Sequence, residues 1–259
     1  MADTPQSHSI SRGVEIHASP ATVYRLLTES ALFARWAGEG SEISAEAGSP
    51  MIVRFPNGDT AEGEVMQSER DELVVFTWGY PIESKGVPVG STRVEITLDA
   101  QDDGTELELK HSGFANAEIA NAHVGGWRHM LSKLSTSACE EQVGEGLDER
   151  IDAYFAAWNE DDPAKRPALL ADSVTEDFVY RDKHGMTTSR IEYLEYVNTT
   201  RAHMPNSHVV RMGPVSLSEG LVLVRWSVTS EGKPLASGTN VCYLSGRGLL
   251  REVRAFWED

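Results

Sequence analysis

Residues 147–185 constrain the fold of this chain more than any other stretch, because they mark the start of a second folded unit. Apolar side chains from Leu147 to Trp158 recur at the three- and four-residue intervals of one helix face. The segment just before them, residues 140–146, is polar and holds two glycines, which is typical of a linker. The pattern therefore predicts that the chain folds as two domains rather than one.

The length of 259 residues is compatible with two domains of ordinary size. We expect residues 1–8 to be disordered, residues 9–139 to form the first domain, residues 140–146 to link the two, and residues 147–259 to form the second. A hydrophobic content of 40% is enough for packed cores in both.

The net charge of −17 argues against partners that carry phosphate groups. Such a chain would be repelled by nucleic acid and by an anionic membrane surface, so neither is an expected partner. The N-terminus lacks a basic segment followed by an apolar one, and no apolar run approaches the roughly 18–20 residues of a spanning helix. With two cysteines as well, the composition predicts a cytoplasmic protein without a disulfide framework.

The first predicted domain begins with a strand and two short helices, followed by a run of alternating strands and one long helix. Asn57-Gly58 is a strong hairpin signal within that run. The long helix over residues 117–139 has an apolar stripe that includes Trp127. A curved antiparallel sheet must bury one face, and this helix is the obvious cover for it.

The residues of this region resemble the START-like (SRPBCC) superfamily, and within it the homologues of the activator of heat-shock-protein-90 ATPase. The motifs that carry the resemblance are Ser19 to Tyr24, Leu32 to Trp36, Phe55-Pro56 with Gly58, Phe76-Thr77-Trp78, Gly104-Thr105 with Leu107 and Leu109, His111 to Phe114, and Gly126-Trp127. The resemblance implies a helix-grip fold with a hydrophobic cavity. It does not imply co-chaperone activity, because nothing matches the separate chaperone-binding region of the eukaryotic activator.

The second predicted domain has three helices followed by a meander of long strands, which is an α+β pattern. It resembles the nuclear transport factor 2-like superfamily in its SnoaL-like and ketosteroid-isomerase-like branch. The matching motifs are Tyr154 to Asn159, Leu169 to Asp172, Tyr180-Arg181-Asp182 with Gly185, and Val253 to Trp257. The resemblance implies a cone-shaped α+β barrel around an internal pocket, and a homodimer formed through the sheet.

The same resemblance implies a set of candidate catalytic residues. In ketosteroid isomerases a tyrosine, a basic aspartate and a protonated acid act on an enolate. Tyr154 lies at the tyrosine position, Asp182 at the base position, and Asn240 where the family has its second acid. An asparagine cannot act as a neutral acid, but its amide can still donate a hydrogen bond.

Two structural alternatives stand beside this hypothesis. Tyr154 fits equally a core tyrosine whose hydroxyl group finds a backbone partner. Asp182 fits a turn cap, because Asp-x-x-Gly is common turn chemistry.

Further residues face the expected cavities by periodicity and are candidates for ligand binding. They are Trp36, Phe55, Phe76, Trp78, His111, His123, Trp127, Phe178 and Tyr180. The aromatic residues among those of the first domain are more typical of a plain core than of an aromatic ligand site. A third ligand at recognisable spacing is missing beside the two histidines, so we expect no metal site, and no motif indicates a cofactor.

The sequence thus favours binding of a small hydrophobic or polyketide-like metabolite. If the protein is an enzyme, we expect a cofactor-independent isomerase, cyclase or dehydratase that transfers a proton. The alternative is a non-catalytic binding or stress-related interaction module.

Overall fold

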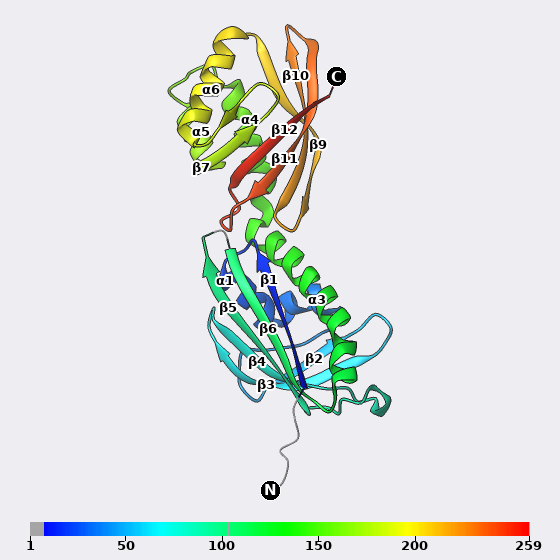
Figure 1. Cartoon of the computed structure of the whole chain (residues 1–259). Helices are drawn as coiled ribbons and strands as arrows, with labels where there is room; N and C mark the ends of the chain where they lie inside the picture. Colours follow the sequence, from blue (N-terminus) through cyan, green and yellow to red (C-terminus); the bar gives the residue numbers. More distant parts are fainter. Residues whose placement is uncertain (1–7, 103, 259) are drawn as a thin grey trace. The chain divides into compact units, whose positions relative to one another are not determined.

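The computed structural model describes residues 8–102 and 104–258, which form two compact units, Met1–Glu141 and Gln142–Asp259 (Figure 1). Each unit is a mixture of helices and one sheet, so the predicted α+β class is confirmed for both. Of the segment expected to be disordered, residues 1–7 lie outside the described residues, and His8 begins the first strand.

In its described residues, the N-terminal unit has six strands, three α-helices and a 3-10 turn. In chain order these elements are β1 (His8–Ile16), α1 (Pro20–Thr28), α2 (Ser30–Ala37), β2 (Pro50–Arg54), β3 (Thr60–Glu69), β4 (Leu73–Trp78), η1 (Glu83–Lys85), β5 (Thr92–Gln101), β6 (Gly104–Phe114) and α3 (Ala117–Val143). The sheet has the strand order β1-β6-β5-β4-β3-β2, and every neighbouring pair is antiparallel.

Alternation of side chains explains how this sheet buries one face. In β6, Leu107, Leu109 and His111 point inward, while the residues between them are exposed. The predicted hairpin joins β2 to β3, and Gly58 adopts a φ of 87°, which a residue with a Cβ rarely reaches. The period of two and the turn chemistry thus set the register of the sheet together.

The long helix α3 covers the buried face of the sheet. Its inward stripe, Trp127, Leu131 and Leu134, belongs to the same core cluster as Ile96 of β5 and Leu107 of β6. This arrangement is the helix and sheet pair expected from the sequence.

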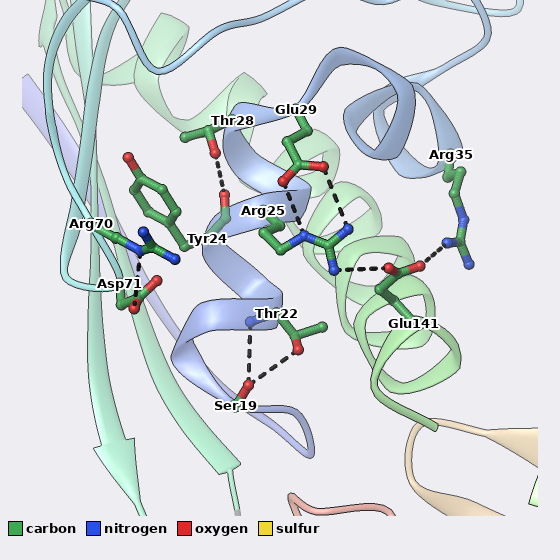
Figure 2. A network of polar contacts seen from close by, with 10 residues as sticks. All are labelled: Ser19, Thr22, Tyr24, Arg25, Thr28, Glu29, Arg35, Arg70, Asp71 and Glu141. Atoms are coloured by element: carbon green, nitrogen blue, oxygen red, sulfur yellow. Dashed lines mark hydrogen bonds and ion pairs between the residues drawn. The ribbon is translucent and has the colours of Figure 1, made fainter. Parts of the chain in front are cut away.

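A network of charged groups joins the C-terminal end of α3 to the two short helices (Figure 2). Glu141 accepts a hydrogen bond from Arg25 of α1 at 3.1 Å and another from Arg35 of α2 at 2.7 Å. Arg25 also pairs with Glu29 at 3.0 Å within its own helix. One carboxylate therefore holds three helices at fixed positions.

Up to residue 258, where the described part of the chain ends, the C-terminal unit has three α-helices, a 3-10 turn and a second sheet of six strands. Its elements are η2 (Gly144–Gly146), α4 (Leu147–Asn159), α5 (Arg166–Ala171), β7 (Val174–Arg181), β8 (Met186–Thr187), α6 (Arg190–His203), β9 (Ser207–Ser218), β10 (Leu221–Ser230), β11 (Lys233–Leu244) and β12 (Leu250–Glu258). The strand order is β8-β7-β12-β11-β10-β9, antiparallel except for the β12–β7 pair. The helices gather on one face of this sheet (Figure 1).

Residues 140–146, the predicted linker, are helical, because α3 runs to Val143 and η2 follows it directly. One detail differs from the expectation. The second sheet is open, with β8 and β9 as edges in the part of the chain that the structure describes, so it is a curved sheet and not a closed barrel.

Asn159, the last residue of α4, explains how the helical layer is attached to the edge of this sheet. Its side-chain amide donates to the carbonyl oxygen of Val209 at 2.7 Å and accepts from the Val209 backbone N–H at 2.8 Å. The side chain thereby pairs with β9 as a neighbouring strand would. This contact fixes α4 against the strand that borders the cavity described below.

We expect Glu141→Ala to destabilise the N-terminal unit by about 1 kcal/mol, because it removes two partly exposed ion pairs at once. Glu140→Ala is the matched control, since Glu140 makes a single, longer contact of 3.3 Å with Arg35. Thermal denaturation at low and high salt measures both variants. Equal effects of the two substitutions would contradict the central role of Glu141.

Candidate functional site

The C-terminal unit contains a cavity of about 530 Å³ between its helical layer and its sheet. Side chains from α4, α6 and five strands line it, together with the turn after β7. Seven aromatic rings form most of its wall: Tyr154, Phe155, Trp158, Tyr180, Tyr196, Trp226 and Trp257. A cavity of this size and character is typical of a site for a small organic molecule.

Tyr154 stands at the end of a chain of hydrogen bonds. Trp158 Nε1 donates to the hydroxyl oxygen of Tyr193 at 2.8 Å, and the Tyr193 hydroxyl donates to that of Tyr154 at 2.7 Å. Within the described residues, no acceptor receives the hydroxyl proton of Tyr154. Burial raises the pKa of Tyr154, so the hydroxyl group keeps its proton and can donate it in a hydrogen bond to a molecule in the cavity.

Asp182 does not line the cavity, although β7 brings it close to the wall. Its Oδ2 accepts hydrogen bonds from the hydroxyl groups of Tyr180 and Tyr196, both at 3.0 Å. Its Oδ1 accepts from the backbone N–H groups of His184 at 2.7 Å and Gly185 at 2.8 Å. These contacts are those of the turn-cap alternative, extended by two wall tyrosines, and they occupy both carboxylate oxygens.

Asn240 of β11 is the third residue of the proposed catalytic set, and it does line the cavity. It pairs in register with Val224 of β10 and Ala255 of β12, so its side chain shares their buried face. Only 4% of the residue is exposed, and its Oδ1 has no hydrogen-bond partner among residues 8–102 and 104–258. The structure therefore brings Tyr154 and Asn240 to one cavity and leaves Asp182 behind its wall.

Two tryptophans that the sequence did not single out shape the sheet side of the cavity. Trp226 and Trp257 lie on either side of Gly238 in the register, with ring centres 5.0 Å apart in an edge-to-face arrangement. A Cβ on Gly238 would lie 2.4 Å from the Trp226 ring and 2.1 Å from the Phe256 carbonyl oxygen. Only a glycine lets the indole lie across β11 here. The sequence signal that could have identified these two residues is a glycine inside a strand with a tryptophan on each neighbouring strand.

The two remaining candidates of this unit have different positions. Tyr180 lines the cavity, and burial raises its pKa well above the ordinary value. Phe178 is fully buried but lies behind the wall, where its ring packs against Tyr193 at 4.9 Å and Tyr154 at 6.3 Å. Phe178 therefore supports the wall tyrosines rather than the cavity itself.

His111 of the N-terminal unit belongs to a closed chain of buried hydrogen bonds. Trp127 Nε1 donates to its Nδ1 at 3.0 Å, so the ring proton is on Nε2, which donates to the Thr92 hydroxyl at 2.8 Å. Thr92 in turn donates to the carbonyl oxygen of Trp78 at 2.8 Å. Burial, with a smaller effect of His123, lowers the pKa of His111 to about 3. Both ring nitrogens are occupied, as in a satisfied core histidine.

His123 is satisfied in the same way. Its Nδ1 donates to the carbonyl oxygen of Ile119 at 2.8 Å, and its Nε2 lies 3.2 Å from the hydroxyl group of Tyr80. Burial lowers its pKa as well. In the part of the chain that is described, no three metal-ligating side chains come together around either histidine or elsewhere.

The aromatic candidates of the N-terminal unit are part of its packed core. Trp36, Phe76, Trp78 and Trp127 are buried in the core cluster, and Phe55 packs against its edge. None of these five residues, nor either histidine, lines the cavities at the Tyr154 wall or beside Arg211. The plain-core alternative thus describes the contacts that these side chains make.

Comparison with known proteins identifies one matching family. Residues 17–138 match the family model of the Activator of Hsp90 ATPase homolog 1-like protein, which confirms the first resemblance inferred from the motifs. No curated protein matches the chain. None of the helices described above combines the length and the apolar character that a bilayer crossing requires.

Several solved structures are similar to parts of the chain. A candidate isomerase of the SnoaL-like family from Agrobacterium tumefaciens has 23% identity and a TM-score of 0.42, and the match covers 45% of this chain and 100% of that one. An AHSA1-like protein from Rhizobium etli has 31% identity and a TM-score of 0.41, with 52% and 84% covered. The Aha1 dimer from Colwellia psychrerythraea has 20% identity and a TM-score of 0.43, with 54% and 99% covered.

The pKa of His111 makes the stability of the N-terminal unit depend on pH. The unfolded histidine binds a proton near pH 6.5, whereas the folded one does so only near pH 3. The contribution of the neutral His111 to the folding stability is therefore complete above pH 6.5. It is lost as the pH falls, at up to about 1.4 kcal/mol per pH unit.

We expect His111→Gln to lower stability at pH 7.5 and to reduce this slope between pH 6.5 and pH 4.5. Urea denaturation of the wild type and the variant at a series of pH values measures the difference. Above pH 7.5 the two curves should run parallel, which serves as the internal control. An unchanged slope in the variant would rule out the buried neutral histidine as its origin.

Proposed function

We propose that the C-terminal unit is a domain that binds a small hydrophobic molecule in its aromatic cavity. The observation that carries the proposal is a cavity of about 530 Å³ lined by Asn240 and Tyr154. Among the described residues, the buried Oδ1 of Asn240 has no hydrogen-bond partner, and the Tyr154 hydroxyl, which accepts from Tyr193, has no acceptor for its own proton. Buried polar groups are nearly always paired in native proteins. A bound molecule with a polar group would supply the missing partner for Asn240 and Tyr154.

The two groups have complementary abilities in this role. The Tyr154 hydroxyl has its oxygen engaged by Tyr193 and offers its proton, so it suits an acceptor such as a carbonyl oxygen. The Asn240 amide can both donate and accept. The rings around them would pack against the apolar part of the molecule. We propose that Tyr154 and Asn240 orient the ligand and that the rings supply most of the affinity.

Chemical conversion of the ligand would need a base at the cavity. Asp182 was the candidate, but its two oxygens already accept hydrogen bonds from four donors. We therefore propose binding as the function, and isomerisation, cyclisation or dehydration as an additional outcome that product analysis would reveal. The acidic composition supports a cytoplasmic location for this binding protein.

We propose a separate role for the N-terminal unit as a domain of its own, over residues 9–139. Its aromatic residues and histidines are engaged in a core, which supports a structural or interaction role of the kind expected for a stress-related module. Ligand binding by the other unit does not depend on this role.

We also propose that the C-terminal sheet forms a homodimer through its outer face. Leu221 and Leu223 of β10 are 40% and 49% exposed, and Tyr243 of β11 lies opposite Leu221 in the register. Phe256 of β12 is 57% exposed on the same face. Apolar side chains gathered in this way on one face are typical of an interaction surface.

The binding proposal predicts opposite effects of Asn240→Leu on stability and on affinity. The unliganded protein should become more stable by about 1–3 kcal/mol, because a buried unpaired amide is replaced by an apolar side chain of similar size. Ligand affinity should fall by about tenfold or more, because one hydrogen bond to the ligand is lost. Tyr154→Phe should weaken binding by a similar factor.

Thermal-shift screening against steroid, polyketide-type and fatty-acid compounds, followed by calorimetry, measures both effects. Thr239→Val is the matched control, because Thr239 lies on the same strand and points to the other face of the sheet. A purely structural Asn240 would give lower stability in the leucine variant. The absence of any stabilising compound would favour the interaction module instead.

The dimer proposal predicts that Leu223→Glu produces monomers without loss of folding, because Leu223 is half exposed in the single unit. Ile191→Glu is the control, since Ile191 of α6 is 72% exposed away from the sheet. Analytical ultracentrifugation of both variants and the wild type decides the matter. A monomeric wild type, or a dimeric Leu223→Glu variant, would contradict the proposal.

A further inference from the structure

No aspartate, glutamate, lysine or arginine is among the described side chains that line the aromatic cavity, although 24% of the chain is charged. The imidazole of His184 does line it, and the ammonium group of Lys183, which is not a lining residue, lies 5.2 Å from the centre of the Trp257 ring. Transfer of a charge from water into such a place is strongly unfavourable unless a partner of opposite sign neutralises it. No carboxylate, ammonium or guanidinium group among these described lining side chains would pair with a charged ligand.

The carboxylate group of Asp182 does not line the cavity, but it is hydrogen-bonded to two tyrosines that do. Asp182 Oδ2 holds the hydroxyl groups of Tyr180 and Tyr196, whose rings line the cavity, at 3.0 Å each. No lysine or arginine of the described chain forms an ion pair with Asp182, and its hydrogen-bond partners there are two hydroxyl groups and two backbone N–H groups. Burial and then the charge of Asp182 raise the pKa of Tyr196, which shows that this wall disfavours a further negative charge.

A cation meets different obstacles. The lone pairs of Asp182 that could neutralise it are committed to two hydroxyl groups and two backbone N–H groups. The ammonium group of Lys183 already lies 5.2 Å from the centre of the Trp257 ring, so a positive charge is present at that ring. The aromatic faces would still attract a cation in part, which makes the penalty smaller than for an anion.

We infer that the cavity takes an uncharged aromatic ligand with a hydrogen-bonding group at the end that reaches Asn240, and that it discriminates against cations and still more against anions. The inference rests on the proposed binding function and specifies the class of molecule that is bound. Aromatic carboxylic acids, phosphorylated compounds and fatty-acid anions fall outside this class.

Three matched probes test the charge preference on the full-length protein. They are 2-acetylnaphthalene, trimethyl(2-naphthyl)ammonium and 2-naphthoate, which share one ring system and differ in the charge of the substituent. The neutral ketone should bind most tightly. The anion should bind more weakly by about tenfold or more, with the cation between them. Isothermal titration calorimetry or competition with a fluorescent ligand measures the three dissociation constants.

Two variants assign the discrimination to the charge of Asp182. Asp182→Asn removes the charge and disturbs the hydrogen bonds, whereas Tyr196→Phe removes one of the same hydrogen bonds and keeps the charge. The ratio of the dissociation constants for anion and ketone should shrink several-fold in Asp182→Asn and stay at the wild-type value in Tyr196→Phe. If both variants lose affinity for the ketone, the cause is the hydrogen bond between Tyr196 and Asp182 that both substitutions remove or disturb. The ratio of the anion and ketone dissociation constants can still be compared between the two variants.

The outcomes separate the two proposals. Naphthoate bound as tightly as the ketone, the ammonium probe bound most tightly, or an unchanged ratio in Asp182→Asn would each overturn the charge inference while the binding function stands. If none of the three probes binds, the proposed function and this inference both fail.

Discussion

An ionised carboxylate can only accept hydrogen bonds, and Asp182 uses this property to hold the cavity wall together. The hydroxyl group of Tyr180 comes from β7, that of Tyr196 from α6, and two backbone N–H groups come from the turn between β7 and β8. An asparagine at this position would present two N–H groups to donors and could satisfy fewer of them. The contact thus requires a carboxylate for structural reasons alone, which explains an aspartate here without assigning it a proton-transfer step.

The positions of Tyr193 and Tyr154 depend in turn on the two tyrosines that Asp182 holds. The ring of Tyr193 packs beside the two tyrosines that Asp182 holds, with its centre 5.0 Å from that of Tyr180 and 6.4 Å from that of Tyr196. The hydroxyl group of Tyr193 in turn donates a hydrogen bond to the hydroxyl oxygen of Tyr154. The N-terminal unit contains a different arrangement. Its series of hydrogen bonds through His111 ends on a carbonyl oxygen, and both ring nitrogens of His111 are paired. The hydrogen-bond chain through His111 is closed, whereas the chain that ends at Tyr154 is open at a cavity, and this contrast supports the proposed binding role of the second unit.

Much of this arrangement could be predicted from periodicity and turn chemistry. The period of two placed His111 and Asn240 on inward faces, and the Asn57-Gly58 turn set the first hairpin. Periodicity gives the face on which a side chain lies but not its partner on another element. It therefore placed Asp182 near the pocket but could not show that Tyr196 of α6 would occupy its carboxylate. The polar composition of residues 140–146 predicted a linker but not its helical conformation, because such a composition also fits an exposed helix end.

The cavity itself has a thermodynamic consequence. Empty apolar volume forfeits packing, and an unpaired buried amide such as that of Asn240 costs about 1–3 kcal/mol. Contacts away from the cavity must offset this loss, and the pairing of Asn159 with β9 is one of them. A ligand that fills the space and pairs the amide stabilises the folded state by an amount that grows with its concentration relative to its dissociation constant. Stability and occupancy are then linked in this unit. In the N-terminal unit, by contrast, His111 and His123 find their hydrogen-bond partners within the protein.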